Sequence, residues 1–415
     1  MTAFTGMQGR ARSGVVLCAP VLPPDVTAIA AALERSGQLQ HLVTRWCLNN
    51  REFRWVQKLA VPQTWLRRPV TSVSSRRVHR SVVADARQLL GRLIDRNGFQ
   101  SFDKSFALVD TAASRLLRRT SSAVLGREDA CLISFRRAQE LGLPCIYQLP
   151  TAHFATVERL LRQELNLFPE AFDAADLEAD FAPERKQRKT AELATATHIL
   201  CASSFVKRSL ETAGVPSRNI KVIPCATELD FAPQCPSPRE PIVLYAGAIS
   251  PRKGVHRLIR VWKQLGAYRT HTLRLVGDLR LPSSFVAEYR RYFEHVPRIK
   301  RSALAREYAR AQAFVFNAMA DGFGHVMAEA MACGTAVLAS RNSGALELIS
   351  DREQGWLFDF GNDAALAEAL EWALTFPQQL LEMGEQGQAR ARAWNADTFA
   401  TEFLKWIAPI IAGER

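Results

Sequence analysis

Short runs of β-branched and apolar residues alternate along the chain with longer segments in which apolar residues recur every three or four positions. This alternation is typical of a parallel sheet whose strands are joined by crossover helices. In the first half of the chain it predicts strands over residues 14–19, 130–134, 144–149, 197–202 and 220–224. The pattern therefore indicates an α/β protein with doubly wound, Rossmann-like sheets.

A proline-rich segment divides the pattern into two halves. Residues 231–241 contain four prolines, which suit neither a helix interior nor a central strand. After it, a strand over 242–247, an amphipathic helix from Val255 to Leu265 and a strand over 273–277 begin a second α/β series. We predict an N-terminal domain over 1–235, a C-terminal domain over 241–390, and a helical segment over 391–415 that could pack back on the first domain.

Composition excludes several classes of protein. No window approaches the run of about 18 apolar residues that would span a bilayer, and the first 13 residues are polar, so we expect a cytoplasmic protein. The eight cysteines are scattered, without a C-x-x-C pair, and several lie in apolar runs. They are expected to be buried thiols in a reducing compartment, and a zinc site is not supported.

The net charge of +13 is concentrated in the N-terminal part of the chain. Residues 1–150 carry 22 Lys and Arg against 10 Asp and Glu, and the excess is densest over residues 51–96. A basic surface of this kind favours contact with an anionic membrane or an anionic lipid-linked acceptor, although a solvated surface explains it equally well. Peripheral attachment to a membrane is one expectation, and a nucleic-acid partner is not expected.

The chemistry is concentrated in residues 321–340. Gly322 and Gly324 precede a helix, so the backbone there can approach an anion closely while the helix presents unpaired N–H groups. His325 and Glu329 are four residues apart and would project from one face of that helix. The stretch has the features of an anion-binding site. A helix N-terminus that carries acidic residues but binds no ligand would have the same pattern.

Neighbouring motifs narrow the interpretation. Residues 245–254 (YAGAISPRKG), 275–277 (LVG), 321–335 (DGFGHVMAEAMACGT), 343–347 (SGALE) and 355–358 (GWLF) occur in the order found in one family. In this order they resemble retaining GT-B glycosyltransferases of the glycosyltransferase family 4 type, in which two acidic residues eight positions apart flank a G-F-G loop. The resemblance covers most of residues 130–390.

The resemblance implies a role for each matching residue. Lys253 would contact the donor diphosphate, Asp321 and the loop of Gly322, Phe323 and Gly324 would contact the transferred sugar, and Glu329 would bind the ribose hydroxyls. Gly247, Arg252 and His325 complete the predicted donor site. A lysine at the diphosphate could supply the charge stabilisation that other enzymes obtain from a metal ion.

The motifs also depart from the family. Ala248 stands where an arginine is usual, which leaves Arg252 as the substitute cation, and Asp321 replaces the usual glutamate. The glycine-rich turn expected after the first strand is absent. The first difference affects the second cationic contact to the donor diphosphate. The missing turn implies that contacts to the acceptor differ from those usual in the family.

His153 is the candidate catalytic residue of the N-terminal half. It follows the strand over 144–149, and open α/β sheets bind ligands at the carboxyl ends of their strands. The resemblance supports an active-site histidine near this position. The alternative is a histidine that caps the helix after it.

We therefore expect a metal-independent GT-B enzyme with no cofactor, in which a UDP- or GDP-linked sugar binds in an interdomain cleft and is transferred with retention to a glycan or lipid-linked acceptor. By family analogy the pathway is polysaccharide, lipopolysaccharide or glycolipid biosynthesis. The alternatives are a GT-B nucleotide-sugar epimerase or hydrolase, and a catalytically weak GT-B binding module.

Overall fold

The structure, a computed structural model, describes residues 13–45, 47, 52, 72–91, 99–226 and 239–413. The chain forms two compact units. Unit 1 comprises Met1–Gln148, Pro183–Ile199 and Ala400–Arg415, and unit 2 comprises Leu149–Ala182 and Leu200–Phe399. The domain boundaries predicted from the sequence, 1–235, 241–390 and 391–415, follow chain order, whereas each of these units combines separate stretches of chain.

The first sheet has seven strands in the order β3-β2-β1-β4-β5-β6-β7, and the pairs formed by strands β1 to β5 are parallel. Its strands are β1 (Val15–Cys18), β2 (Leu39–Arg45), β3 (Val78–Ser81), β4 (Ala123–Arg127), β5 (Cys145–Leu149), β6 (His198–Cys201) and β7 (Ile220–Val222). Strand order reverses next to β1, as in doubly wound folds. The strands predicted at 14–19, 144–149, 197–202 and 220–224 are confirmed.

The strand predicted over 130–134 is wrong, because these residues lead into helix α5 (Leu132–Glu140), and the strand lies upstream as β4. A five-residue apolar run has too little length to distinguish a buried strand from the start of a buried helix. Two backbone amides at the start of α5, those of Ile133 and Ser134, donate to the Asp110 carboxylate at 2.6 and 2.9 Å. This capping by a distant side chain is invisible in the local sequence.

The helices of unit 1 include α1 (Pro24–Arg35), α3 (Val82–Gly91), α4 (Phe99–Leu116), α5 and α8 (Pro183–Thr195), and helix α17 (Ala396–Ala412) ends the chain. Helix α8 is anchored by Glu192, which is fully buried and accepts the backbone N–H groups of Asp129 at 2.9 Å and Cys131 at 3.2 Å. Burial raises the pKa of Glu192 to about 8.

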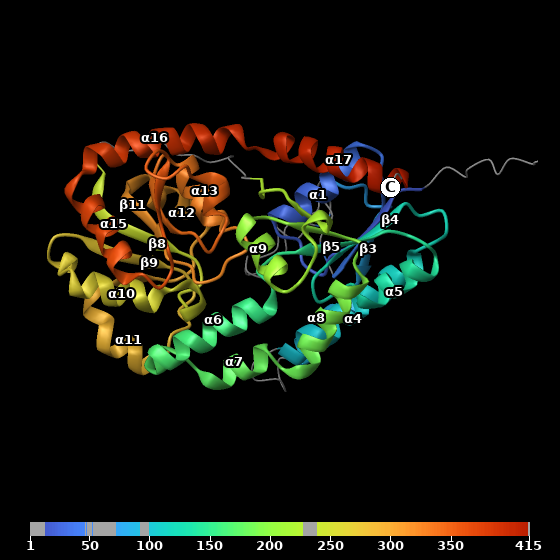
Figure 1. Ribbon diagram of the computed structural model, residues 1–415, viewed down its shortest axis with the longest axis horizontal. Coiled ribbons are helices and arrows are strands. Elements are labelled where there is room, and N and C mark those ends of the chain that lie inside the picture. Colours follow the sequence, from blue (N-terminus) through green and yellow to red (C-terminus); the bar gives the residue numbers. More distant parts are fainter. Residues whose placement is uncertain are drawn as a thin grey trace, which may run out of the picture. The chain divides into compact units, whose positions relative to one another are not determined.

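The second sheet is also parallel, with six strands in the doubly wound order β10-β9-β8-β11-β12-β13. They are β8 (Glu240–Ala246), β9 (Thr272–Val276), β10 (Glu294–Val296), β11 (Ala311–Phe316), β12 (Ala336–Ser340) and β13 (Gly355–Phe358). The two sheets, each flanked by helices, confirm the predicted fold class of two Rossmann-like domains (Figure 1).

Helices cover both faces of the second sheet. In Figure 1, α10 (Val255–Gln264) and α11 (Ser283–Tyr289) lie below its strands, and α12 (Arg301–Arg310), α13 (His325–Ala332) and α16 (Pro377–Ala393) lie above them. Other helices of unit 2 are α6 (Phe154–Leu167), α7 (Ala174–Asp180), α9 (Ser204–Thr212), α14 (Ala345–Leu348) and α15 (Asp363–Thr375). Helix α9 is capped by Ser203, whose hydroxyl accepts from the Val206 amide at 3.3 Å.

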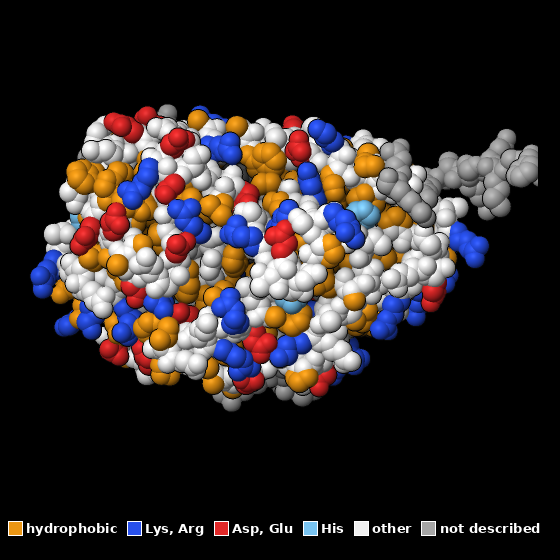
Figure 2. Space-filling view, viewed as in Figure 1, with side chains coloured by type: hydrophobic (Ala, Val, Ile, Leu, Met, Phe, Trp, Pro, Cys, Tyr) orange, Lys and Arg blue, Asp and Glu red, His pale blue; other side chains and the backbone are white. Residues whose placement is uncertain are grey.

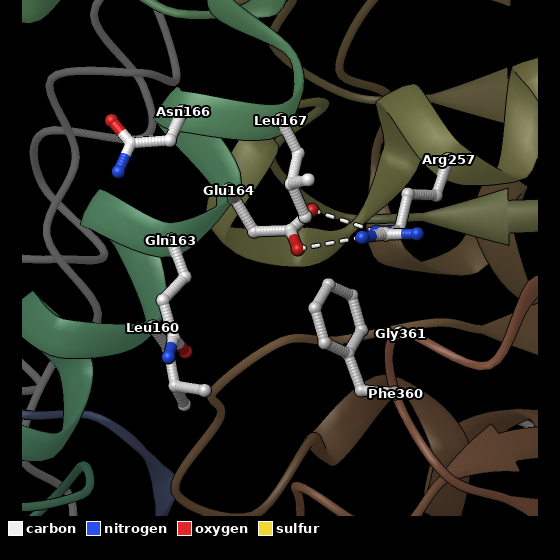
Figure 3. Close-up of a pocket in the computed structure, with 8 residues that line it drawn as sticks. All are labelled: Leu160, Gln163, Glu164, Asn166, Leu167, Arg257, Phe360 and Gly361. Atoms are coloured by element: carbon white, nitrogen blue, oxygen red, sulfur yellow. Dashed lines mark hydrogen bonds and ion pairs between the residues drawn. The ribbon is translucent and has the colours of Figure 1, made fainter.

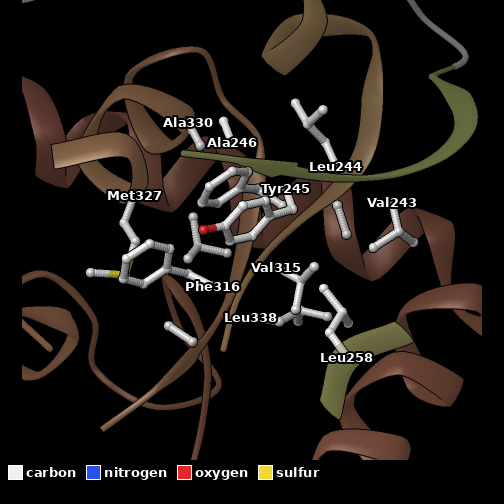
Figure 4. Packing of buried hydrophobic residues seen from close by; sticks show 14 of the residues in the cluster. Val243, Leu244, Tyr245, Ala246, Leu258, Val315, Phe316, Met327, Ala330 and Leu338 are labelled. Carbon is white, nitrogen blue, oxygen red and sulfur yellow. The ribbon is translucent and has the colours of Figure 1, made fainter. Parts of the chain in front are cut away.

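The core of unit 2 is continuous beneath the carboxyl ends of its strands. Tyr245 of β8 and Phe316 of β11 stack with ring centroids 6.5 Å apart, and Met327 of α13 lies beside them (Figure 4). The Tyr245 hydroxyl donates to the carbonyl of Ala248 at 2.8 Å, so this ring also holds the turn after β8. The packing places a rigid floor under the loops that follow β8 and β11.

Some predictions fall partly or wholly outside the described residues. Residues 51, 53–71 and 92–96 of the basic segment 51–96 lie outside them, as do residues 231–238 of the predicted linker, which include Cys235. The other seven cysteines are buried free thiols, as predicted. On the face drawn in Figure 2, basic and acidic side chains are interspersed. Among the helices described, none has the length and apolar content to cross a membrane.

Helix α16 provides a matched test of the packing. A Cβ at Gly384 would lie 2.0 Å from the carbonyl oxygen of Gly334, whereas a Cβ at Gly387 would come no closer than 3.3 Å to another atom. Gly384→Ala should lower the free energy of unfolding by roughly 1–3 kcal/mol through overpacking. Gly387→Ala should stay within about 1 kcal/mol of wild type, because alanine favours the helix. Urea unfolding of both variants measures the difference, and equal stabilities would contradict the packing described.

Candidate functional site

The loop after β8 carries Lys253 and depends on glycines where segments of backbone meet. Gly247 has φ +136°, and its N–H donates to the carbonyl of Val276 at 2.9 Å. After the 3-10 turn Pro251–Lys253, Gly254 begins α10 with φ +66°, and a Cβ there would lie 1.9 Å from the carbonyl oxygen of Asn317. Only glycine permits both the left-handed conformation and this approach. Lys253 is therefore held against the end of β11.

The loop after β11 carries Asp321 and leads into α13. Its backbone is joined to the Lys253 loop, since the Met319 amide donates to the carbonyl of Arg252 at 3.1 Å. Asp321 folds back on its own loop, accepting from the Phe323 amide at 3.0 Å. Gly324, at φ +84°, is the N-cap of α13, so the first turn of this helix opens at the loop.

These two loops bring Lys253 and Asp321 into direct contact. The Lys253 ammonium forms an ion pair with the Asp321 carboxylate, and both side chains remain partly exposed, at 23% and 16%. The ammonium also lies 5.7 Å from the centroid of the Phe316 ring. Burial and the neighbouring charge of Arg252 lower the pKa of Lys253 to about 7. The Asp321 carboxylate acts in the opposite direction, because an adjacent anion favours the ammonium.

The segment after β5 completes this side of the site. The Arg252 guanidinium donates to the hydroxyl of Thr151 at 2.6 Å. Gly322 has no room for a side chain, since a Cβ would lie 1.9 Å from the carbonyl oxygen of Pro150. Arg252 is therefore already engaged by Thr151, a residue that sequence reasoning missed because an isolated threonine in a loop carries no recognisable pattern.

His153 follows this contact and is the N-cap of α6. Its Nδ1 accepts from the Ala155 amide at 3.3 Å, and its backbone N–H donates to the hydroxyl of Ser209 at 2.9 Å. The ring also lies against Phe154, with centroids 4.4 Å apart. The capping alternative describes what the side chain does in this structure. A catalytic role remains a prediction.

The other end of the predicted donor site lies on α13. Glu329 pairs with the Arg301 guanidinium at 2.8 Å, and the buried Tyr308 hydroxyl donates to it at 3.4 Å. His325 is the first residue of α13, and its ring lies 5.4 Å from the ring of Phe323. Arg301 and Tyr308 were missed from the sequence, because they belong to α12, which has no motif of its own.

The structure thus places most of the predicted donor-site residues on the loops after β8 and β11 and at the start of α13, namely Gly247, Arg252, Lys253, Asp321, Gly322, Phe323, Gly324 and His325. Glu329 lies one turn further along α13. The helix start and cationic side chains there can bind a phosphate-containing anion. Among the described residues, no group of three or more His, Cys, Asp or Glu side chains is arranged to hold a metal ion. Metal independence remains a prediction.

Comparison with known proteins relates the chain to glycosyltransferases. Residues 228–390 match the family model described as glycosyl transferases group 1. Among solved structures, sucrose-phosphate synthase from Thermosynechococcus elongatus superposes with a TM-score of 0.65 at 20% identity, covering 97% of this chain and 100% of that one. HepE of Anabaena in complex with UDP-glucose gives a TM-score of 0.61 at 15% identity, with 95% and 99% covered. The resemblance to glycosyl transferases group 1 and the GT-B fold are both confirmed, whereas the retaining mechanism and the family 4 type remain predictions.

Curated relatives are similar over part of their length. A GDP-mannose-dependent phosphatidylinositol monomannoside mannosyltransferase of Mycolicibacterium smegmatis is 26% identical over 252 residues, 51% of this chain and 61% of that protein. The capsular polysaccharide biosynthesis glycosyltransferase CapM of Staphylococcus aureus is 25% identical over 154 residues, 36% and 40% of the two chains. The chain thus spans less than two thirds of these relatives.

The lowered pKa of Lys253 predicts that the site takes up a proton when a nucleoside diphosphate binds. A diphosphate would raise the pKa of Lys253 above the value of about 7 that it has in the free site. Well below pH 7 Lys253 is already protonated, so its titration should not affect nucleotide affinity. Above pH 7 nucleotide binding should be accompanied by proton uptake at Lys253. The affinity should then fall by up to about tenfold per pH unit as the pH rises.

Calorimetric titration with UDP and GDP at pH 8, in buffers of different ionisation enthalpy, measures the uptake. Lys253→Arg is the control, because arginine stays protonated and should remove the buffer dependence. A wild-type enthalpy that is the same in all buffers at pH 8 would contradict this assignment.

Proposed function

We propose that this chain, whose residues 228–390 belong to the glycosyl transferases group 1, transfers a sugar from a nucleotide-sugar donor to an acceptor hydroxyl with retention of configuration. The observation that carries the proposal is the convergence of Lys253, the Asp321 loop and the start of α13 at one edge of the second sheet. Carboxyl edges of open α/β sheets are where such folds bind nucleotides.

We propose that the donor binds at this edge because the charged side chains there complement its diphosphate and its ribose. Lys253 would meet the diphosphate, the Gly322 to Gly324 backbone and His325 would meet the sugar, and Glu329 would accept from the ribose hydroxyls. The nucleotide of the donor is proposed to be UDP or GDP, since one similar protein is named as GDP-mannose-dependent and one similar structure contains UDP-glucose. Without a donor, Asp321 forms an ion pair with Lys253, and Arg301 forms one with Glu329. Donor binding would therefore replace these ion pairs with contacts to the donor.

Transfer would proceed on the face of the sugar from which the diphosphate leaves. The bond between the anomeric carbon and the phosphate oxygen breaks, the acceptor oxygen bonds to that carbon, and the acceptor proton passes to the departing phosphate. The Lys253 ammonium would stabilise the charge that develops on the diphosphate, which is where fixed charge accelerates such a step. No protein nucleophile and no metal ion enter this scheme.

The acceptor is proposed to be a glycan or a lipid-linked saccharide. Similar proteins are named for a phosphatidylinositol mannoside, a capsular polysaccharide and a diphospho-undecaprenol acceptor. Acceptors of this kind carry anionic groups or lie at anionic membranes, which agrees with the basic excess of residues 1–150. We therefore place the enzyme at the cytoplasmic face of a membrane, in polysaccharide or glycolipid assembly.

Lys253→Ala and Glu329→Ala test the donor site, and their losses should differ. Glu329→Ala should weaken nucleoside diphosphate binding by about tenfold to a hundredfold, because charge-assisted hydrogen bonds contribute roughly 1.5–3 kcal/mol. Lys253→Ala should in addition lower turnover by about a hundredfold or more, because its charge acts on the leaving group. Titration with UDP and GDP, turnover of a panel of UDP- and GDP-sugars, and thermal melting are the measurements.

Three outcomes separate the proposal from its alternatives. Consumption of the donor without any acceptor would indicate a hydrolase or epimerase. Donor binding without turnover of any sugar, in the presence of membrane glycolipid acceptors, would indicate a binding module. Wild-type nucleotide affinity in both variants, or lost binding explained by a collapsed melting temperature, would place the donor elsewhere.

His153→Ala separates capping from catalysis. If the ring orients the sugar or acceptor in the transition state, turnover should fall by about tenfold or more while nucleotide affinity stays near wild type. His153→Asn is the control, because asparagine is a good N-cap and should retain the stability of α6 while lacking the imidazole. Turnover within about twofold of wild type in both variants would leave His153 a capping residue only.

A further inference from the structure

A buried carboxylate on α6 is bonded to the start of the helix that follows Lys253. Glu164 is 4% exposed. Its Oε1 accepts from Nη2 of Arg257 at 2.8 Å, and its Oε2 accepts from Nε of Arg257 at 2.7 Å and lies 2.9 Å from Nε2 of His256. Figure 3 shows the paired contacts between Glu164 and Arg257 at the edge of a surface hollow of about 470 Å³.

The surroundings hold these side chains in one arrangement. The Arg257 guanidinium also donates to Asp363 at the start of α15, at 2.8 Å, and its carbon lies 4.5 Å from the Phe168 ring centroid. His256 is fully buried between Phe168 and Phe172, at 5.3 and 5.7 Å. Burial alone would raise the pKa of Glu164, but hydrogen bonds from His256 and Arg257 lower it below its ordinary value. Glu164 is therefore an anion at neutral pH.

His256 and Arg257 lie three and four residues after Lys253. Arg252, on the other side of Lys253, donates to Thr151 at 2.6 Å. Thr151 and Glu164 stand at the two ends of one short segment, the turn before α6 and the last part of α6. That segment therefore holds the Lys253 loop from both sides.

The backbone at Gly254, between the Arg252–Thr151 contact and the contacts of Glu164, has no room to shift. A Cβ there would lie 1.9 Å from Asn317 and 2.8 Å from the ring of Phe360, so this backbone is already packed on further sides. A shift of α10 along α6 would carry Lys253 with it. The position of the ammonium consequently depends on a carboxylate that touches neither Lys253 nor the predicted donor.

We propose that Glu164 is a positioning residue for the donor site: through His256 and Arg257 it holds the Lys253 loop in the geometry that meets a diphosphate. The effect of Glu164 on catalysis rests on the proposed function. Its effect on the position of the Lys253 loop can be measured without a ligand. An ion pair kept only for stability would lower the melting temperature when broken and leave the Lys253 loop unchanged.

Glu164→Gln is the test, and Glu307→Gln is its matched control. Glu307 also accepts from a partly buried arginine of unit 2, Arg274 at 2.6 Å, but this pair joins α12 to β9 and does not contact the Lys253 loop. The full chain is used for both variants. Amide hydrogen exchange over residues 251–258, without ligand, should accelerate by about tenfold or more in Glu164→Gln and stay at the wild-type rate in Glu307→Gln.

UDP and GDP titrations and turnover give the functional readout. Glu164→Gln should lower nucleotide affinity and turnover by about tenfold to a hundredfold, since small misplacements of a catalytic group have effects of this size. In a Lys253→Ala background the same change should add less than about twofold, because Glu164 acts through Lys253. If Glu164→Gln fails to fold, Arg257→Lys replaces it, because lysine retains the charge but cannot form the paired contact.

Unchanged exchange over 251–258 in Glu164→Gln, or losses that add fully to those of Lys253→Ala, would overturn the inference. A wild-type protein that binds neither nucleotide while Glu164→Gln still loosens this loop would contradict the proposed function and leave the positioning role standing. The two failures are therefore distinguishable.

Discussion

The close approach of backbone segments at the carboxyl edge of the second sheet is the constraint on which the site depends. Gly254 meets the carbonyl of Asn317, Gly277 meets that of Gly247, and Gly322 meets that of Pro150, each with a notional Cβ only 1.9 Å from an oxygen. Side chains at these positions would separate the loops. Because the loops meet, Lys253 after β8 and Asp321 after the adjacent strand β11 reach one another.

Such proximity has an electrostatic consequence. Partly buried charges are stable only when they are compensated, and the site provides its own counter-ions, with Asp321 against Lys253 and Arg301 against Glu329. A ligand that replaces these partners must therefore offer an anionic group to Lys253 and hydrogen-bond donors to Glu329. A diphosphate joined to a ribose by a short linkage has an anionic end and a hydroxyl-bearing end, whereas a free sugar has only hydroxyls. The nucleotide part of the proposed donor would therefore meet both requirements.

The sequence predicted those parts of the fold and site that are encoded locally. The strand at 242–247 and the helix after Gly324 depend on alternation and on a glycine, both of which are visible within a few residues. The strand predicted at 130–134 failed because Asp110, distant in sequence, caps α5. Thr151, Arg301 and Glu164 were missed for the same reason, since each matters through one contact with a residue far along the chain.

Chain order also concealed which unit the segment after β5 belongs to. Leu149–Ala182 groups with the second sheet, although the strand that leads into it belongs to the first. The physical reason is apolar as well as ionic: Ala152, Val157 and Leu161 are buried against Met319 and Ala320 of the loop that leads to Asp321. A boundary drawn at the proline-rich segment would sever these contacts and expose that apolar surface together with the buried Arg257. The proposed donor site thus draws on both halves of the sequence, and residues 241–390 alone contain its motifs without the segment that packs against them.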